Sequence, residues 1–129
     1  MTVGTSMRRA AQKLIDDFGN TAALYTYSSA TKTESSEGDI TVTNWGSATT
    51  IIAVNGNLIA NSLMIETQGI EDVGNDEKAI RDNVAIAVND RLTMNSVEYK
   101  VTQVRPVRIQ NTLVVQFVSF EVVRSTTVW

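Results

Sequence analysis

The sequence contains no cysteine and no histidine, and only 6% of its 129 residues are aromatic. Without cysteine there is no disulfide framework, no thiolate nucleophile and no cysteine-ligated zinc. Without histidine the chain lacks the usual general base of catalysis and the commonest metal ligand. We therefore expect no enzyme, no cofactor and no metal site.

No stretch approaches the roughly 18 consecutive apolar residues that a membrane-spanning helix needs. The first residues, MTVGTSMRRAAQ, carry arginines with no apolar run after them, so they do not predict a signal peptide. The net charge of −3 argues against general binding of polyanions, because phosphate contacts need clustered Lys and Arg. These features predict a protein that is made in the cytoplasm and does not enter a membrane.

What is present suffices for one folded domain, because 43% of the residues are hydrophobic and 19% are charged. Patterns of alternating apolar and polar residues dominate after the first twenty positions. We predict a single, mainly β domain over residues 1–129, a small barrel or sandwich of antiparallel strands. Its parts are one N-terminal amphipathic helix at about 6–18, strands within about 21–124, a long internal loop at about 55–77 and a tail at 125–129.

The segment SMRRAAQKLIDDFG predicts the helix. Ser6 fits the N-cap position and Gly19 fits the residue that ends the helix. The apolar positions recur at three- and four-residue spacing and form one stripe: Met7, Ala10, Ala11, Leu14, Ile15 and Phe18.

The helix charges oppose its dipole, since Arg8 and Arg9 lie near the N-terminal end and Asp16 and Asp17 near the C-terminal end. Lys13 can pair with either aspartate but recovers little free energy. Packing against the sheet or against another subunit must therefore stabilise this helix.

Several strand predictions follow from alternation. Residues 28–39 read as an exposed loop or a long hairpin tip, and the β-branched run 47–54 suits a strand buried on both faces. Residues 83–88 alternate and predict a further strand. The turn Asn95–Ser96 joins two more strands, of which the second points Val97, Tyr99 and Val101 inward and ends at Pro106. Residues 112–123, apolar on both faces, form the last strand, with one face in the barrel and the other free to meet the helix or a neighbouring chain.

The loop at 55–77 is interrupted by glycines, and its second half carries no basic residue before Lys78. A solvated acidic loop is the simplest interpretation, although a structureless loop of this length usually has a function. Its carboxylates lack the alternating spacing of a Ca²⁺ loop. They are Glu66, Glu71, Asp72, Asp76 and Glu77.

A small barrel can also bind single-stranded nucleic acid through aromatic rings beside basic residues. The C-terminal part is locally basic, with Lys100, Arg105, Arg108 and Arg124. However, Tyr99, Phe117 and Phe120 fall in strand patterns that fit the core. We therefore interpret the four basic side chains as solvated or as interface charges.

In LIDDFGNTAALY, residues 14–25, the predicted helix ends at Gly19 and runs directly into the first strand. NDRLTMNSVEYKVTQVRP, residues 89–106, predicts a closing hairpin, and a last apolar strand ending in Arg124 follows. Together these segments resemble the head-closure proteins of tailed bacteriophages, the stopper ring of the head-to-tail connector. Asn89 stands where that family often has glycine, but asparagine tolerates the left-handed conformation.

The resemblance implies a small β-barrel with a helix and a long loop, assembled as a homo-oligomeric ring, a hexamer or dodecamer, in the virion neck. Its partners would be the portal or adaptor ring, tail proteins and the double-stranded DNA that passes through without sequence-specific contacts. The acidic loop would line or gate the channel. Expected subunit or ring contacts are Arg8, Arg9, Asp16, Asp17, Arg105, Arg108 and Trp129.

The nearest alternative is the tail terminator or tail-completion ring protein of the same neck. Those proteins more often show a sheet flanked by two helices, whereas this sequence predicts one. A single-stranded nucleic-acid-binding barrel and an enzyme are more distant alternatives.

Overall fold

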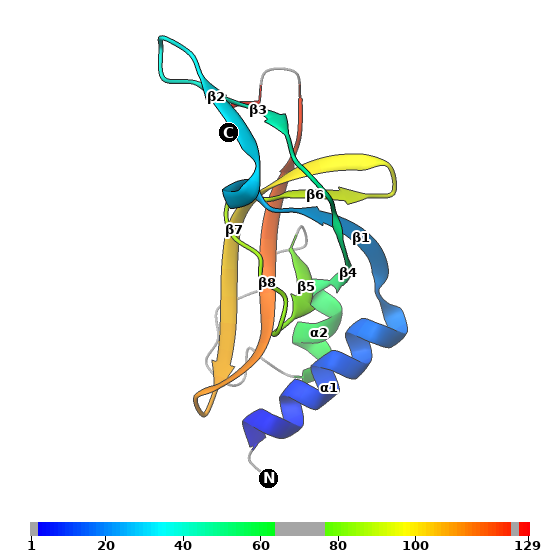
Figure 1. Cartoon of the computed structure of the whole chain (residues 1–129). Helices are drawn as coiled ribbons and strands as arrows, with labels where there is room; N and C mark the ends of the chain where they lie inside the picture. The colour runs from blue at the N-terminus through cyan, green and yellow to red at the C-terminus, as the bar shows by residue number, and fades with distance from the viewer. Residues whose placement is uncertain (1–2, 64–76, 125–126) are drawn as a thin grey trace.

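The computed structural model describes residues 3–63, 77–124 and 127–129. Along these residues the helices are α1 (Val3–Phe18) and α2 (Gly56–Leu63), with one 3₁₀ turn, η1 (Tyr27–Ser29) (Figure 1). The strands are β1 (Asn20–Tyr25), β2 (Thr31–Glu34), β3 (Ile40–Asn44), β4 (Thr49–Asn55), β5 (Lys78–Arg81), β6 (Arg91–Met94), β7 (Val97–Ile109) and β8 (Thr112–Val122). The mainly β prediction is confirmed.

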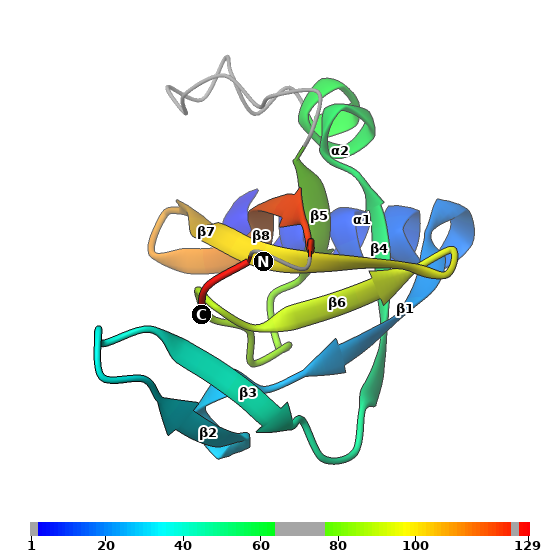
Figure 2. The same cartoon turned by 90° about the horizontal axis from the view of Figure 1, so that it is seen from above.

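Six strands close into an antiparallel barrel in the order β1-β4-β5-β8-β7-β6 (Figure 2). Because the barrel is closed, each of its six strands pairs with a neighbouring strand on both sides along at least part of its length. The barrel interior is filled by apolar residues from all six strands, namely Ala22, Leu24, Ile51, Ala53, Ile80, Leu92, Val101 and Val118. The prediction that the run at 47–54 is buried on both faces holds only for its second half: residues 47–50 are exposed, whereas Ile51 faces this interior and Val54 faces a second cluster beneath the helices.

That second cluster holds α1 against β8. Ala11 and Ile15 are fully buried against Val115 and Phe117 of this strand. The predicted packing of the helix on the sheet is confirmed, and it outweighs the unfavourable dipole charges. Phe18, however, is 63% exposed, so the apolar stripe ends one turn earlier than predicted.

The start of α1 differs from the prediction. Ser6 is not an N-cap, because the helix already begins at Val3. Gly4 brings the first turn so close to the β7–β8 turn that an added Cβ would lie 2.3 Å from the carbonyl oxygen of Ile109. This tertiary contact extends the helix beyond the local capping signal.

The helix α2 corrects the prediction of a loop throughout 55–77. The backbone N–H of Asn57 donates to Oδ1 of Asn55, 3.2 Å away, which caps the start of the helix. Ile59 and Ala60 are buried in the cluster beneath α1. Packing of these two side chains stabilises a short helix that its glycine and asparagines alone would not predict.

Proline 106 does not end its strand, contrary to the prediction. β7 continues to Ile109, and Pro106 lies opposite Gln116 of β8. β6 pairs only with the first part of β7, up to Lys100. Beyond Val101, which exchanges backbone bonds with Asn89 and Asp90, β7 has no strand partner on that edge among the described residues, and a missing N–H there costs no ladder bond.

Residues 83–88 are not a strand, although their alternation predicted one. Val84 and Ile86 still pack against the barrel interior. The backbone of this segment is hydrogen-bonded to side chains and not to a neighbouring strand. Gln116 Nε2 donates to the carbonyl oxygen of Val84, and the N–H of Ala87 donates to Asp90 Oδ2. Val97, expected to point inward, is 39% exposed at the turn that opens β7, whereas Val101 is buried.

β2 and β3 form a separate two-stranded sheet, of which β2 lies within the segment 28–39 predicted as a loop or hairpin tip and β3 follows that segment. Figure 1 shows this hairpin at the end of the molecule opposite the start of α1. Neither described helix is long and apolar enough to cross a membrane.

Candidate functional site

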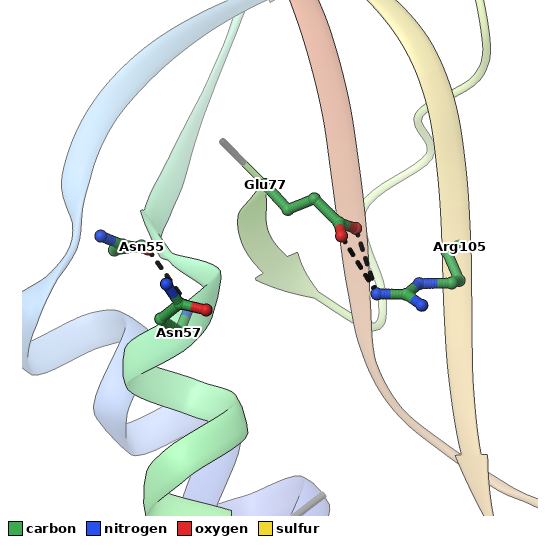
Figure 3. Close-up of polar contacts among 4 residues, drawn as sticks. All are labelled: Asn55, Asn57, Glu77 and Arg105. Atoms are coloured by element: carbon green, nitrogen blue, oxygen red, sulfur yellow. Dashed lines mark hydrogen bonds and ion pairs between the residues drawn. The ribbon is translucent and has the colours of Figure 1, made fainter. Parts of the chain in front are cut away.

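The predicted channel segment is anchored at its C-terminal end by an ion pair. Nη2 of Arg105 lies 3.1 Å from Oε1 and 3.3 Å from Oε2 of Glu77, as Figure 3 shows. The two side chains are 21% and 14% exposed, and the guanidinium of Arg105 also lies over the ring of Phe117. Burial makes this pair sensitive to the loss of either member.

The same end is tied to α2 through the backbone, because the N–H of Gly56 donates to the carbonyl oxygen of Glu77 at 2.9 Å. The Asn55–Asn57 cap lies close by at the start of α2 (Figure 3). The chain therefore leaves the barrel at the end of β4 and returns to it at Glu77, beside Gly56.

Of the predicted channel carboxylates, the structure describes only Glu77. It is held by Arg105, a base that lies far away in the sequence and was not foreseen as its partner. The other four lie outside the described residues: Glu66, Glu71, Asp72 and Asp76.

The residues predicted at subunit contacts do not lie on one surface. Asp16 pairs with Arg81 at 3.6 Å and Asp17 with Lys13 at 3.1 Å, so both contribute to contacts within the chain. Arg8, Arg9 and Arg108 lie on α1 and beside the β7–β8 turn, and Arg108 is exposed. Whether any of these residues touches another subunit stays a prediction.

Trp129 has a partner in its own chain. Its ring lies edge to face with that of Trp45, with centroids 4.8 Å apart. Trp45 also lies 6.5 Å from Tyr25 and 6.3 Å from Tyr27, measured between ring centroids. We call Tyr25, Tyr27, Trp45 and Trp129 the aromatic cluster.

Cations cover the rings of the aromatic cluster. Lys32 Nζ lies 4.2 Å from the ring centre of Tyr27, and Lys100 Nζ lies 5.5 Å from that of Trp129. Arg91 lies over both Tyr25 and Trp45 and pairs with Glu98. Sequence reasoning missed this cluster, whose rings come from β1, η1, the segment after β3 and the end of the chain.

The closing hairpin contains a buried carboxylate that joins three segments. Asp90 is 2% exposed, and its oxygens accept from the N–H groups of Tyr27 and Ala87, each at 2.9 Å. The residue before it, Asn89, has φ 77°, so the left-handed conformation expected from the resemblance is confirmed. Asn89 and Asp90 therefore contribute to the scaffold, and both carboxylate oxygens of Asp90 are engaged in these hydrogen bonds.

No group of three or more acidic residues lies close enough to hold a metal ion within the ranges that the structure describes. A hollow of about 290 Å³ lies between Tyr27 and residues 85–88, and its one titratable wall residue besides that tyrosine is Asp90. Both oxygens of Asp90 accept backbone hydrogen bonds.

No protein-family model matches the chain, and no curated protein matches it either.

Proposed function

We propose that this chain is a head-closure protein of a tailed-bacteriophage neck. It would form a ring between the portal or adaptor and the tail, retain packaged DNA and offer the tail a surface for attachment. The observation that carries the proposal is the architecture: a small closed barrel whose N-terminal helix ends at Gly19 and runs directly into β1. This is the architecture that the resemblance implies.

The acidic segment would line or gate the channel through which the DNA passes. Glu66, Glu71, Asp72 and Asp76 carry negative charge, while Glu77 is neutralised by Arg105 at the barrel wall. A negative lumen repels phosphates and lets a duplex slide without sticking. The Glu77–Arg105 pair would fix the position at which the segment meets the barrel.

The experiment is negative-stain microscopy of the purified protein mixed with DNA-filled, tailless heads. We expect density at the portal vertex and retention of DNA. Heads that remain uncapped at saturating protein would overturn the proposal.

The same microscopy with purified tails in place of heads distinguishes the tail-terminator alternative from the head-closure role. The helix α2 removes the single-helix argument against that alternative, so the comparison of heads with tails is needed. Binding to tails alone would assign the chain to that role.

A second candidate is binding of single-stranded nucleic acid, because the aromatic cluster combines π-faces with Lys32, Arg91 and Lys100. Both tryptophans of the chain belong to this cluster. Tryptophan fluorescence therefore reports on it directly. Salt-dependent quenching by an oligothymidine would favour this function, and an unchanged spectrum would remove it.

A further inference from the structure

The β2–β3 hairpin shares no strand pairing with the barrel in the described residues. It forms a sheet of its own, so the outer edge of each strand has no strand partner among the described residues. One backbone bond to the C-terminal segment lies beside its turn, where the N–H of Trp129 donates to the carbonyl oxygen of Ile40, the residue opposite Glu34. A two-stranded hairpin is only marginally stable in water without further packing. The unpaired strand edges therefore leave the hairpin open to an external partner.

The tip of this hairpin gathers unpaired negative charge. Glu34, Glu37 and Asp39 are exposed, and their carboxylates make no ion pair or hydrogen bond within the described part of the chain. By contrast, the carboxylates of Asp16, Asp17, Glu77 and Glu98 are all paired with bases. The tip would repel nucleic acid and anionic lipid, so its partner must present positive charge.

Such a surface lies at the opposite end of this same chain (Figure 1). Gly4 holds the first turn of α1 against Ile109 and Thr112 of the β7–β8 turn. This contact places Arg8 and Arg108 at one end of the molecule, and neither guanidinium is in an ion pair among the described residues. We call these two residues the basic end.

We propose that the β2–β3 tip of one copy docks on the basic end of the next copy. The two surfaces differ, so the contact is heterologous and propagates head to tail, closing into a ring where the rotation allows. This inference names the partner surface of the proposed ring and rests on the proposed function for its biological setting.

Charge reversal tests the contact. One variant carries Glu34→Lys, Glu37→Lys and Asp39→Lys; a second carries Arg8→Glu and Arg108→Glu. Assembly is measured by analytical ultracentrifugation at about 0.05 M and about 0.5 M salt, because exposed charge pairs are screened at the higher concentration. We expect the wild type to assemble at low salt and each variant to weaken assembly by about a hundredfold or more.

An equimolar mixture of the two variants should assemble again, because each contact in an alternating array then joins opposite charges. The matched control, Lys13→Glu with Arg124→Glu, changes the same charge at exposed sites away from the basic end and should assemble as the wild type does. Circular dichroism and tryptophan fluorescence verify folding of every variant.

A wild type that stays monomeric at low salt, variants that still assemble, or a mixture that fails to recover would overturn this contact. Capping of heads is scored separately. Rings that recover in the mixture but never cap heads would retain the contact and remove the proposed function. Rings that cap heads but are insensitive to charge reversal would retain the proposed function and remove the contact.

Discussion

Trp45 and Trp129 lie edge to face with their ring centroids 4.8 Å apart, and the contact joins the end of the chain to the segment that follows the β2–β3 hairpin. Lys100 strengthens the junction by donating to the carbonyl oxygen of Val128 at 2.6 Å. The aromatic cluster thus closes one end of the molecule without any strand pairing.

Trp129→Ala should lower the free energy of unfolding by about 1–2 kcal/mol, because it removes an aromatic pair together with its buried area. Trp129→Phe should recover part of that loss. Urea denaturation followed by circular dichroism measures both effects. An alanine variant as stable as the wild type would mean that the junction contributes nothing to stability.

Arg105→Leu should destabilise the chain by about 2–3 kcal/mol, because it leaves the largely buried carboxylate of Glu77 without its partner. The double variant with Glu77→Leu should be more stable than the single one, since no charge then remains unpaired. Denaturant titration of wild type, both single variants and the double variant gives the coupling free energy. A coupling near zero would show that the pair does not hold the return of the chain to the barrel.

Asn89→Gly should change the free energy of unfolding by no more than about 0.5 kcal/mol, because glycine adopts the observed φ of 77° without strain. Asn89→Val should cost about 2 kcal/mol, because a β-branched residue is strained in that conformation. Thermal denaturation of the two variants makes the comparison. Equal stability of the glycine and valine variants would contradict it.

Gly4→Ala should destabilise the chain by about 1–3 kcal/mol even though alanine favours helices, because its Cβ would overlap the Ile109 carbonyl oxygen. Ser6→Ala is the matched control on the same helix. It should be neutral or slightly stabilising, since Ser6 lies inside the helix and not at its cap. A loss of about 1 kcal/mol in Ser6→Ala would instead restore the capping interpretation.

Local pattern predicted those parts of the fold whose cause is local. The apolar stripe predicted the helix that packs through Ala11 and Ile15. The Asn95–Ser96 turn is confirmed by φ angles of 51° and 66°, which suit a tight hairpin. Predictions failed where a distant segment decides the outcome, as at Pro106, which is tolerated because its strand has an open edge there.

The candidate site was predicted less well for the same reason. Glu77 was identified as a carboxylate of the acidic segment, but its neutralisation depends on Arg105, which only the barrel brings beside it. The contacts of Tyr25 and Tyr27 with Trp45 depend on the path of the hairpin, which no local pattern specifies.

The sequence by itself determined the class of this protein: a mainly β domain, one long amphipathic helix, tight turns at asparagine and an acidic segment, since each follows from periodicity or the conformational preference of one residue. The tertiary structure alone decided barrel closure, the helix α2, the Glu77–Arg105 pair and the opposition of an acidic tip to a basic end. These depend on contacts between residues far apart in the chain, whose formation is governed by the packing of the whole domain.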